Sequence, residues 1–187
     1  MPRAGLDTAR VVDAASAIAD AEGLEAVTLA RVAGGLGVRA PSLYNHVDGR
    51  AGLLRALALR GVRELTAALR DAAIGRAGAD ALAATARAYR AYAAAHPGLY
   101  AASVAAPARD DAEQQAAAAE AIDVIYAVLR GWQLEGDDAV HAVRAFRSAV
   151  HGFVALEAAG GFGIPVDVDT SFERLVATLA GGLATGR

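Results

Sequence analysis

The stretch from Thr28 to Leu54, TLARVAGGLGVRAPSLYNHVDGRAGLL, decides the fold of the N-terminal part of this chain. Thr28 is a good N-cap residue, and apolar residues then recur at helical spacing as far as Leu36. Gly37 ends this short helix, because glycine readily takes the left-handed conformation of a helix terminus. Pro41 opens a second helix, where its missing N–H would be unpaired in any case. The stretch therefore predicts a helix-turn-helix unit.

The second helix of this unit has an apolar face and a polar face. Leu43 and Val47 lie four residues apart, so both can pack inward. The opposite face is short, polar and aromatic, and a DNA major groove admits one such helix with its N-terminal residues against the base edges. The candidates for contact with base edges are Arg39, Ala40, Pro41, Ser42 and Asn45. The candidates for contact with phosphate or sugar are Tyr44 and His46.

Two of these assignments have alternatives. Arg39 can read a guanine, but it can equally contact a phosphate or be solvated. Tyr44 and His46 can instead complete a small core, although a three-helix unit this short has little interior to fill.

The run from Leu36 to Val47, followed by Asp48-Gly49-Arg50 and Leu53-Leu54, resembles the DNA-binding signature of the tetracycline-repressor (TetR) family. The resemblance implies that Thr28 and Arg50 grip phosphates at the two flanks of the unit. Two positions depart from the family pattern. Asp48-Gly49 stands where relatives often carry Lys and Asn, and the small Ala40 stands where relatives can carry a long base-reading side chain.

Helical patterns continue along the rest of the chain, and no strand pattern occurs. We expect an all-α fold of about nine helices, with a DNA-binding domain at residues 1–50 and a ligand-binding and dimerisation domain at 51–187. The expected later helices cover residues 51–73, 80–95, 98–105 and 112–132, one from Asp137 or Asp138 to 159, and one capped by Asp169 or Thr170. This order resembles the whole TetR architecture, and His151-Gly152 resembles one C-terminal variant of that family.

The resemblance implies a small-molecule pocket within the C-terminal domain. The candidate lining residues are aromatic or imidazole side chains: Tyr89, Tyr92, His96, Tyr100, Tyr126, Trp132, His151 and Phe153. Apolar cavities with a few polar tips are typical of ligand sites. The alternative for each residue is that it fills a core otherwise made of small alanines. Trp132, the only tryptophan, can border the pocket and report on ligand binding, or it can be structural packing.

The last helix carries an apolar stripe at helical spacing, which indicates helix-on-helix packing. The candidate dimer-interface residues are Phe172, Leu175, Val176, Leu179 and Leu183. The alternative is that this stripe covers the core of its own chain. A two-fold homodimer is the symmetry that a palindromic operator needs.

Composition narrows the remaining functions. The chain has 18 basic residues, all arginine, against 21 acidic ones, so DNA affinity must come from a small local patch. It has no cysteine and no metal-ligand spacing, so we expect no metal and no cofactor. No apolar stretch is typical of a signal peptide or membrane span, so we expect a cytoplasmic protein.

We therefore predict a ligand-responsive transcriptional regulator, by family default a repressor released from a palindromic operator by a partly apolar small molecule. One alternative is a helical enzyme acting on a hydrophobic small molecule, although no nucleophile, base and orienter set is complete. Another is an architectural DNA binder without a ligand.

Overall fold

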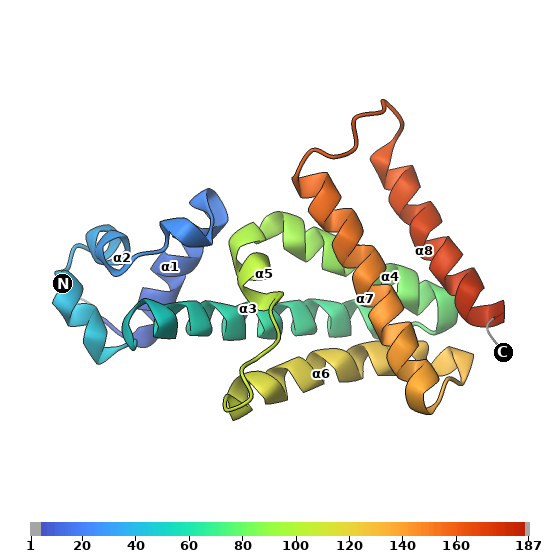
Figure 1. The fold of residues 1–187 in the computed structure, drawn as a ribbon, viewed down its shortest axis with the longest axis horizontal. Helices are drawn as coiled ribbons and strands as arrows, with labels where there is room; N and C mark the ends of the chain where they lie inside the picture. Colours follow the sequence, from blue (N-terminus) through green and yellow to red (C-terminus); the bar gives the residue numbers. More distant parts are fainter. Residues whose placement is uncertain (1–4, 186–187) are drawn as a thin grey trace. The chain divides into compact units, whose positions relative to one another are not determined.

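A computed structural model of the chain describes residues 5–185 (Figure 1). These residues form eight α-helices and three short 3-10 helices, and no strand occurs among them. The prediction of an all-α fold is confirmed. All nine expected helices are present, although one of them is a 3-10 helix.

Capping residues set the ends of the N-terminal helices, and Thr28 and Gly37 act as predicted. Helix α1 (Thr8–Glu22) has Asp7 as its N-cap, and the Asp7 carboxylate accepts a hydrogen bond from the backbone N–H of Arg10. The 3-10 helix η1 (Leu24–Ala26) leads into helix α2 (Leu29–Leu36). Gly37 ends α2 in the left-handed conformation, with φ 68°.

The expected recognition helix is the 3-10 helix η2 (Ala40–Asn45) rather than an α-helix, which corrects the sequence prediction. The backbone N–H of Ser42 bonds to the carbonyl of Arg39 at 2.9 Å, which is the three-residue spacing of a 3-10 helix. The segment is confined between Gly37 and Gly49, both at positive φ. Short helical segments of this kind often take 3-10 bonding, which closes each turn with fewer residues.

The remaining helices follow the predicted order. They are α3 (Gly49–Ala73), α4 (Gly78–Ala95), α5 (Pro97–Ser103), α6 (Ala112–Leu129), η3 (Arg130–Trp132), α7 (Gly136–Ala158) and α8 (Val168–Thr185). Two cap predictions were wrong. Glu135 holds the N-cap position of α7, and Asp137 and Asp138 lie in its first turn. At the start of α8, the carboxylate of Asp167 accepts a hydrogen bond from the backbone N–H of Thr170.

The chain divides into two compact units. Unit 1 holds the chain up to Arg63 together with His96–Ala117, and unit 2 holds Glu64–Ala95 together with the chain from Ala118 onward. Helix α5 belongs to unit 1 because Leu99 joins the core that α1, α2 and the start of α3 build. The division of function after residue 50 stays a prediction.

Each unit has its own apolar core. In unit 1, Val11, Val32, Leu43 and Leu57 are fully buried. In unit 2, the largest buried side chains include Leu82, Phe146, Val150 and Phe172. Within residues 5–185, none of the helices has the length and apolar character needed to cross a membrane.

Candidate functional site

The 3-10 helix η2 presents the surface that the sequence predicts for DNA contact. Leu43 is fully buried and Val47 is 8% exposed, so these two side chains anchor the segment in the core of unit 1. Tyr44 is 62% exposed, and Pro41 and Asn45 are also exposed. A ring this exposed does not fill a core. The exposure therefore argues against the alternative that Tyr44 completes the core of unit 1.

The neighbouring candidates are at least partly accessible. Ala40, Ser42 and His46 are half-buried, and the backbone carbonyl of His46 accepts a hydrogen bond from the Thr8 hydroxyl at 3.4 Å. Arg39 is exposed at the N-cap position of η2, and among residues 5–185 its guanidinium has no ion-pair partner. It is therefore a cation available to an anionic partner.

Thr28 serves the fold directly. Its hydroxyl oxygen accepts a hydrogen bond from the backbone N–H of Arg31 at 3.3 Å, which satisfies one of the unpaired donors at the start of α2. Thr28 is half-buried, so part of the side chain remains accessible.

Arg50 has a structural role that sequence reasoning missed. Its Nε donates to the carbonyl of Val27 at 2.9 Å, and its Nη2 donates to the carbonyl of Leu24 at 3.0 Å. The carboxylate of Glu25 lies 3.5 Å from the same Nη2. Arg50 thus ties the first turn of α3 to η1. No local pattern reveals this contact, because its partners lie more than 20 residues earlier in the chain.

Four other arginines of unit 1 pair with carboxylates. Arg31 pairs with Glu22 at 2.5 Å, Arg60 pairs with Asp13, and Arg55 and Arg63 both pair with Glu113 at 3.0 Å. Among the predicted DNA-contact residues, the positive charge is carried by Arg39 and by the exposed part of Arg50.

The eight candidate pocket residues are divided between the two units. His96 and Tyr100 belong to unit 1, whereas the other six belong to unit 2. His96 Nδ1 lies 3.5 Å from the carboxylate of Asp20. Tyr100 is buried, with 8% of its surface exposed. These two residues therefore belong to the same unit as the N-terminal helices, and their assignment to a ligand pocket stays a prediction.

The six candidates in unit 2 are mainly core residues. Tyr89, Tyr92, Trp132 and Phe153 are each less than 10% exposed, whereas Tyr126 and His151 are half-buried. The ring of Phe153 packs against Phe162 and Phe172, at centroid distances of 4.7 and 5.0 Å. None of the six lines the cavities of unit 2 described below, so their assignment to a ligand pocket stays a prediction.

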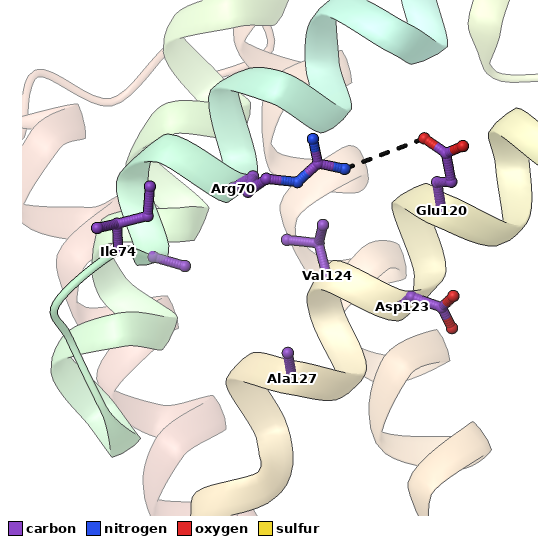
Figure 2. Close-up of a pocket in the computed structure, with 7 residues that line it drawn as sticks. Arg70, Ile74, Glu120, Asp123, Val124 and Ala127 are labelled. Carbon is purple, nitrogen blue, oxygen red and sulfur yellow. Dashed lines mark ion pairs between the residues drawn. The ribbon is translucent and has the colours of Figure 1, made fainter.

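The largest of these cavities lies between the C-terminal parts of α3 and α6 and has a volume of about 430 Å³ (Figure 2). The cavity is lined by the apolar side chains of Ala73, Ile74, Val124 and Ala127 and by the charged side chains of Arg70, Glu120 and Asp123. Arg70 and Glu120 face one another across the rim, with their charged atoms 4.0 Å apart. None of these residues was predicted, because α3 and α6 are about 50 residues apart in the sequence.

The predicted dimer stripe on α8 divides into two sets. Phe172 and Val176 are 1% and 3% exposed. They are therefore buried in the core of their own chain, which is the alternative stated above. Leu175, Leu179 and Leu183 are only half-buried. Together with Leu82 of α4 and with Ala142 and Ala145 of α7, these three leucines line an apolar groove of about 220 Å³.

An arginine and two aromatic rings join the end of α7 to the start of α8. Arg90 of α4 forms two hydrogen bonds to the Glu157 carboxylate and lies 2.8 Å from the Asp169 carboxylate. Its guanidinium also lies over the rings of Phe153 and Phe172, at 5.6 and 5.0 Å. Arg90 lowers the pKa of Glu157 below its ordinary value by hydrogen bonding. This cluster was also missed by sequence reasoning.

Comparison with known proteins identifies the family. The family described as "Tetracyclin repressor-like, C-terminal domain" matches residues 82–179, more than half of the chain. The chain belongs to the TetR family. The HTH-type transcriptional regulator Rv0681 of Mycobacterium tuberculosis is 39% identical over 96% of this chain and 83% of its own length. The regulator YobS of Bacillus subtilis is 34% identical over 97% of this chain and 95% of its own length.

The fold agrees with this assignment. A Rhodococcus sp. RHA1 protein of unknown function superimposes with a TM-score of 0.83 at 27% identity, covering 99% of this chain and all of that one. This TetR-family chain is thus a DNA-binding transcriptional regulator. Regulators of the family bind DNA operators and small-molecule effectors as dimers and are generally not enzymes, so the enzyme alternative has no support.

Proposed function

We propose that this TetR-family regulator is a homodimeric repressor that binds a palindromic operator through η2 and releases it when a small molecule occupies unit 2. The orientation of η2 carries the proposal. Leu43 and Val47 hold the segment in the core of unit 1, so that Tyr44 and Asn45 remain exposed. A short anchored segment with an outward polar face suits the major groove.

The proposed contacts divide into two kinds. Base edges are met by Arg39, Ala40, Pro41, Ser42 and Asn45. The sugar-phosphate backbone is met by Thr28, Tyr44, His46 and Arg50. Phosphate contacts fix the register without reading sequence, so operator preference depends on the first set. Arg50 has a second task in this proposal, because its hydrogen bonds to Val27 and Leu24 hold the loop before α2 in place.

The effector is proposed to be a partly apolar small molecule bound in unit 2. The cavity between α3 and α6 supports this, because it combines apolar side chains with the charged Arg70, Glu120 and Asp123. Helix α3 runs without a break from Gly49 to Ala73 and so carries both Arg50 and Arg70. A rigid tilt of this helix on ligand binding would move the two reading elements of a dimer apart.

Selection of bound fragments from random duplex DNA tests the proposal, followed by gel shifts with the enriched sequence. We expect an inverted repeat whose half-site centres are roughly 34 Å apart or a near multiple, and one dimer per repeat. Recovery of unrelated fragments with equal affinity would instead indicate an architectural DNA binder. A second experiment titrates the protein with a ligand from a small-molecule screen and follows Trp132 fluorescence, with and without operator. If the two sites are coupled, operator must lower the affinity for ligand by the same factor by which ligand lowers the affinity for operator.

A further inference from the structure

Exposed apolar side chains gather in one segment of unit 2. Four of the seven exposed large apolar side chains in the described part of the chain lie between positions 156 and 166. They are Leu156, Phe162, Ile164 and Val166. Ile164 is 77% exposed and Val166 is 64% exposed. Apolar clusters of this kind mark contact surfaces.

Leu156 lies in α7, and the loop that carries the other three, residues 159–167, is held in place at both ends. Arg90 binds Glu157 at the end of α7 and Asp169 in the first turn of α8. Within the loop, the ring of Phe162 packs on Phe153 at 4.7 Å. The loop is therefore a fixed support that presents Ile164 and Val166 to the outside.

The apolar groove described above lies toward the opposite end of the same hairpin. Its α7 residues, Ala142 and Ala145, are near the start of that helix, and its α8 residues extend to Leu183. About 21 Å of helix separates Val168 from Gly182, at 1.5 Å per residue. The loop of a chain thus cannot fill the groove of that same chain.

We propose that in the dimer the 159–167 loop of each chain docks into the α7–α8 groove of its partner, with Ile164 and Val166 entering the groove. This inference rests on the homodimer of the proposed function and specifies its contact. A two-fold axis through the middle of the hairpin brings each loop to the groove end of the partner, so both contacts form at once. The axis would pass near Gly152, where a side chain would meet no atom within 4 Å, so that two α7 helices can approach closely.

Charge favours a second copy over a lipid surface as the occupant. Residues 155–175 carry four acidic residues and one basic residue, and Arg87 and Arg90 of α4 pair with three of these carboxylates. The loop end therefore has no excess of positive charge for anionic lipid. Beside the groove, Arg144 is exposed on α7 next to Ala145, and among residues 5–185 it has no ion-pair partner. Docking would bring the carboxylate of Asp167 of one chain toward Arg144 of the other.

Cysteine cross-linking tests the contact, because the chain has no cysteine of its own. We expect the double variant Ile164→Cys/Gly182→Cys to form a covalent dimer under mild oxidation. A disulfide within one chain is excluded, since the two Cα atoms would have to lie within about 7 Å. The matched control is Ile164→Cys/Ile74→Cys, whose second cysteine replaces another exposed isoleucine, on α3. The control is expected to stay monomeric on a non-reducing gel.

Sedimentation equilibrium gives the second measurement. Ile164→Asp should raise the dimer dissociation constant at least about tenfold, whereas Ile74→Asp should leave it unchanged. A wild-type dimer that gives no cross-link and is unaffected by Ile164→Asp would overturn the loop docking while leaving the homodimer intact. A wild-type chain that is monomeric at micromolar concentration would overturn both the docking and the homodimer.

Discussion

The carboxylate of Asp20, near the end of α1, accepts a hydrogen bond from the backbone N–H of Gly98 in α5 at 2.8 Å. The same oxygen accepts the N–H of Leu99 at 3.1 Å. These N–H groups belong to the first turn of α5, where no intrahelical partner exists. Because Asp20 supplies that partner, α5 is joined to α1 within unit 1, although Asp20 and Gly98 are 78 residues apart in the sequence.

Gly98→Ala should break this contact. A Cβ at position 98 would lie 2.1 Å from the carbonyl carbon of Ala19, which is backbone and cannot move aside as a side chain can. We expect the free energy of unfolding to fall by about 1–3 kcal/mol or more, as for other overpacked sites. Chemical denaturation measures the loss. Gly34→Ala is the control, because a Cβ there meets no atom within 4 Å, and it should be neutral or slightly stabilising.

Arg50→Ala should weaken binding to all DNA sequences by a similar factor and reduce the slope of affinity against salt by about one per subunit. It should also destabilise unit 1, because the carbonyls of Val27 and Leu24 lose their donor. Fluorescence anisotropy over a salt series, together with denaturation, measures the two effects. Ser42→Ala is the comparison: it should change which sequence is preferred and leave the salt slope alone. A change of preference in Arg50→Ala instead would contradict this division of roles.

Arg39→Ala should lower affinity for the selected operator by about 1–3 kcal/mol if the guanidinium reads a guanine. The affected base pair should then become interchangeable in a repeated selection. The control is Arg130→Ala, which removes an exposed arginine from unit 2 instead of unit 1. It should leave operator binding unchanged. Loss of affinity shared equally by all sequences would assign Arg39 to a phosphate, and no loss would show that it is only solvated.

The Arg90 cluster predicts sensitivity to acid. Arg90 lowers the folded-state pKa of Glu157, so this pair stabilises the protein above the unfolded pKa of about 4.3 and loses that contribution as the pH falls through the folded value. Arg90→Ala should reduce the free energy of unfolding at neutral pH by about 1–3 kcal/mol. It should also flatten the decline below about pH 4.5. Thermal unfolding between roughly pH 3 and 7 measures both. An acid decline as steep as that of the wild type would show that Glu157 is not responsible.

The capping and turn residues were sufficient to predict most helix boundaries. Asp7, Thr28 and Gly37 act within a few residues of their own positions, so their effect is visible in the local sequence. The inward direction of Leu43 and Val47 was likewise predictable from their spacing. The 3-10 form of η2 was not, because the choice between three- and four-residue bonding depends on how Gly37 and Gly49 confine the segment.

The sequence by itself determined the all-α fold, the helix-turn-helix and the family, because these depend on local propensity and on a short run of side chains. Only the tertiary structure decided which of these side chains are buried or hydrogen-bonded within the chain itself. Phe172 and Val176 share an apolar stripe with Leu179, yet α8 turns the first two into the core and leaves the third beside an open groove. Arg50 likewise looks free for DNA in the sequence, but its hydrogen bonds go to backbone carbonyls that only folding brings within reach. Helical spacing fixes which residues share a face, whereas the neighbour that covers the face is set by packing over long sequence separations.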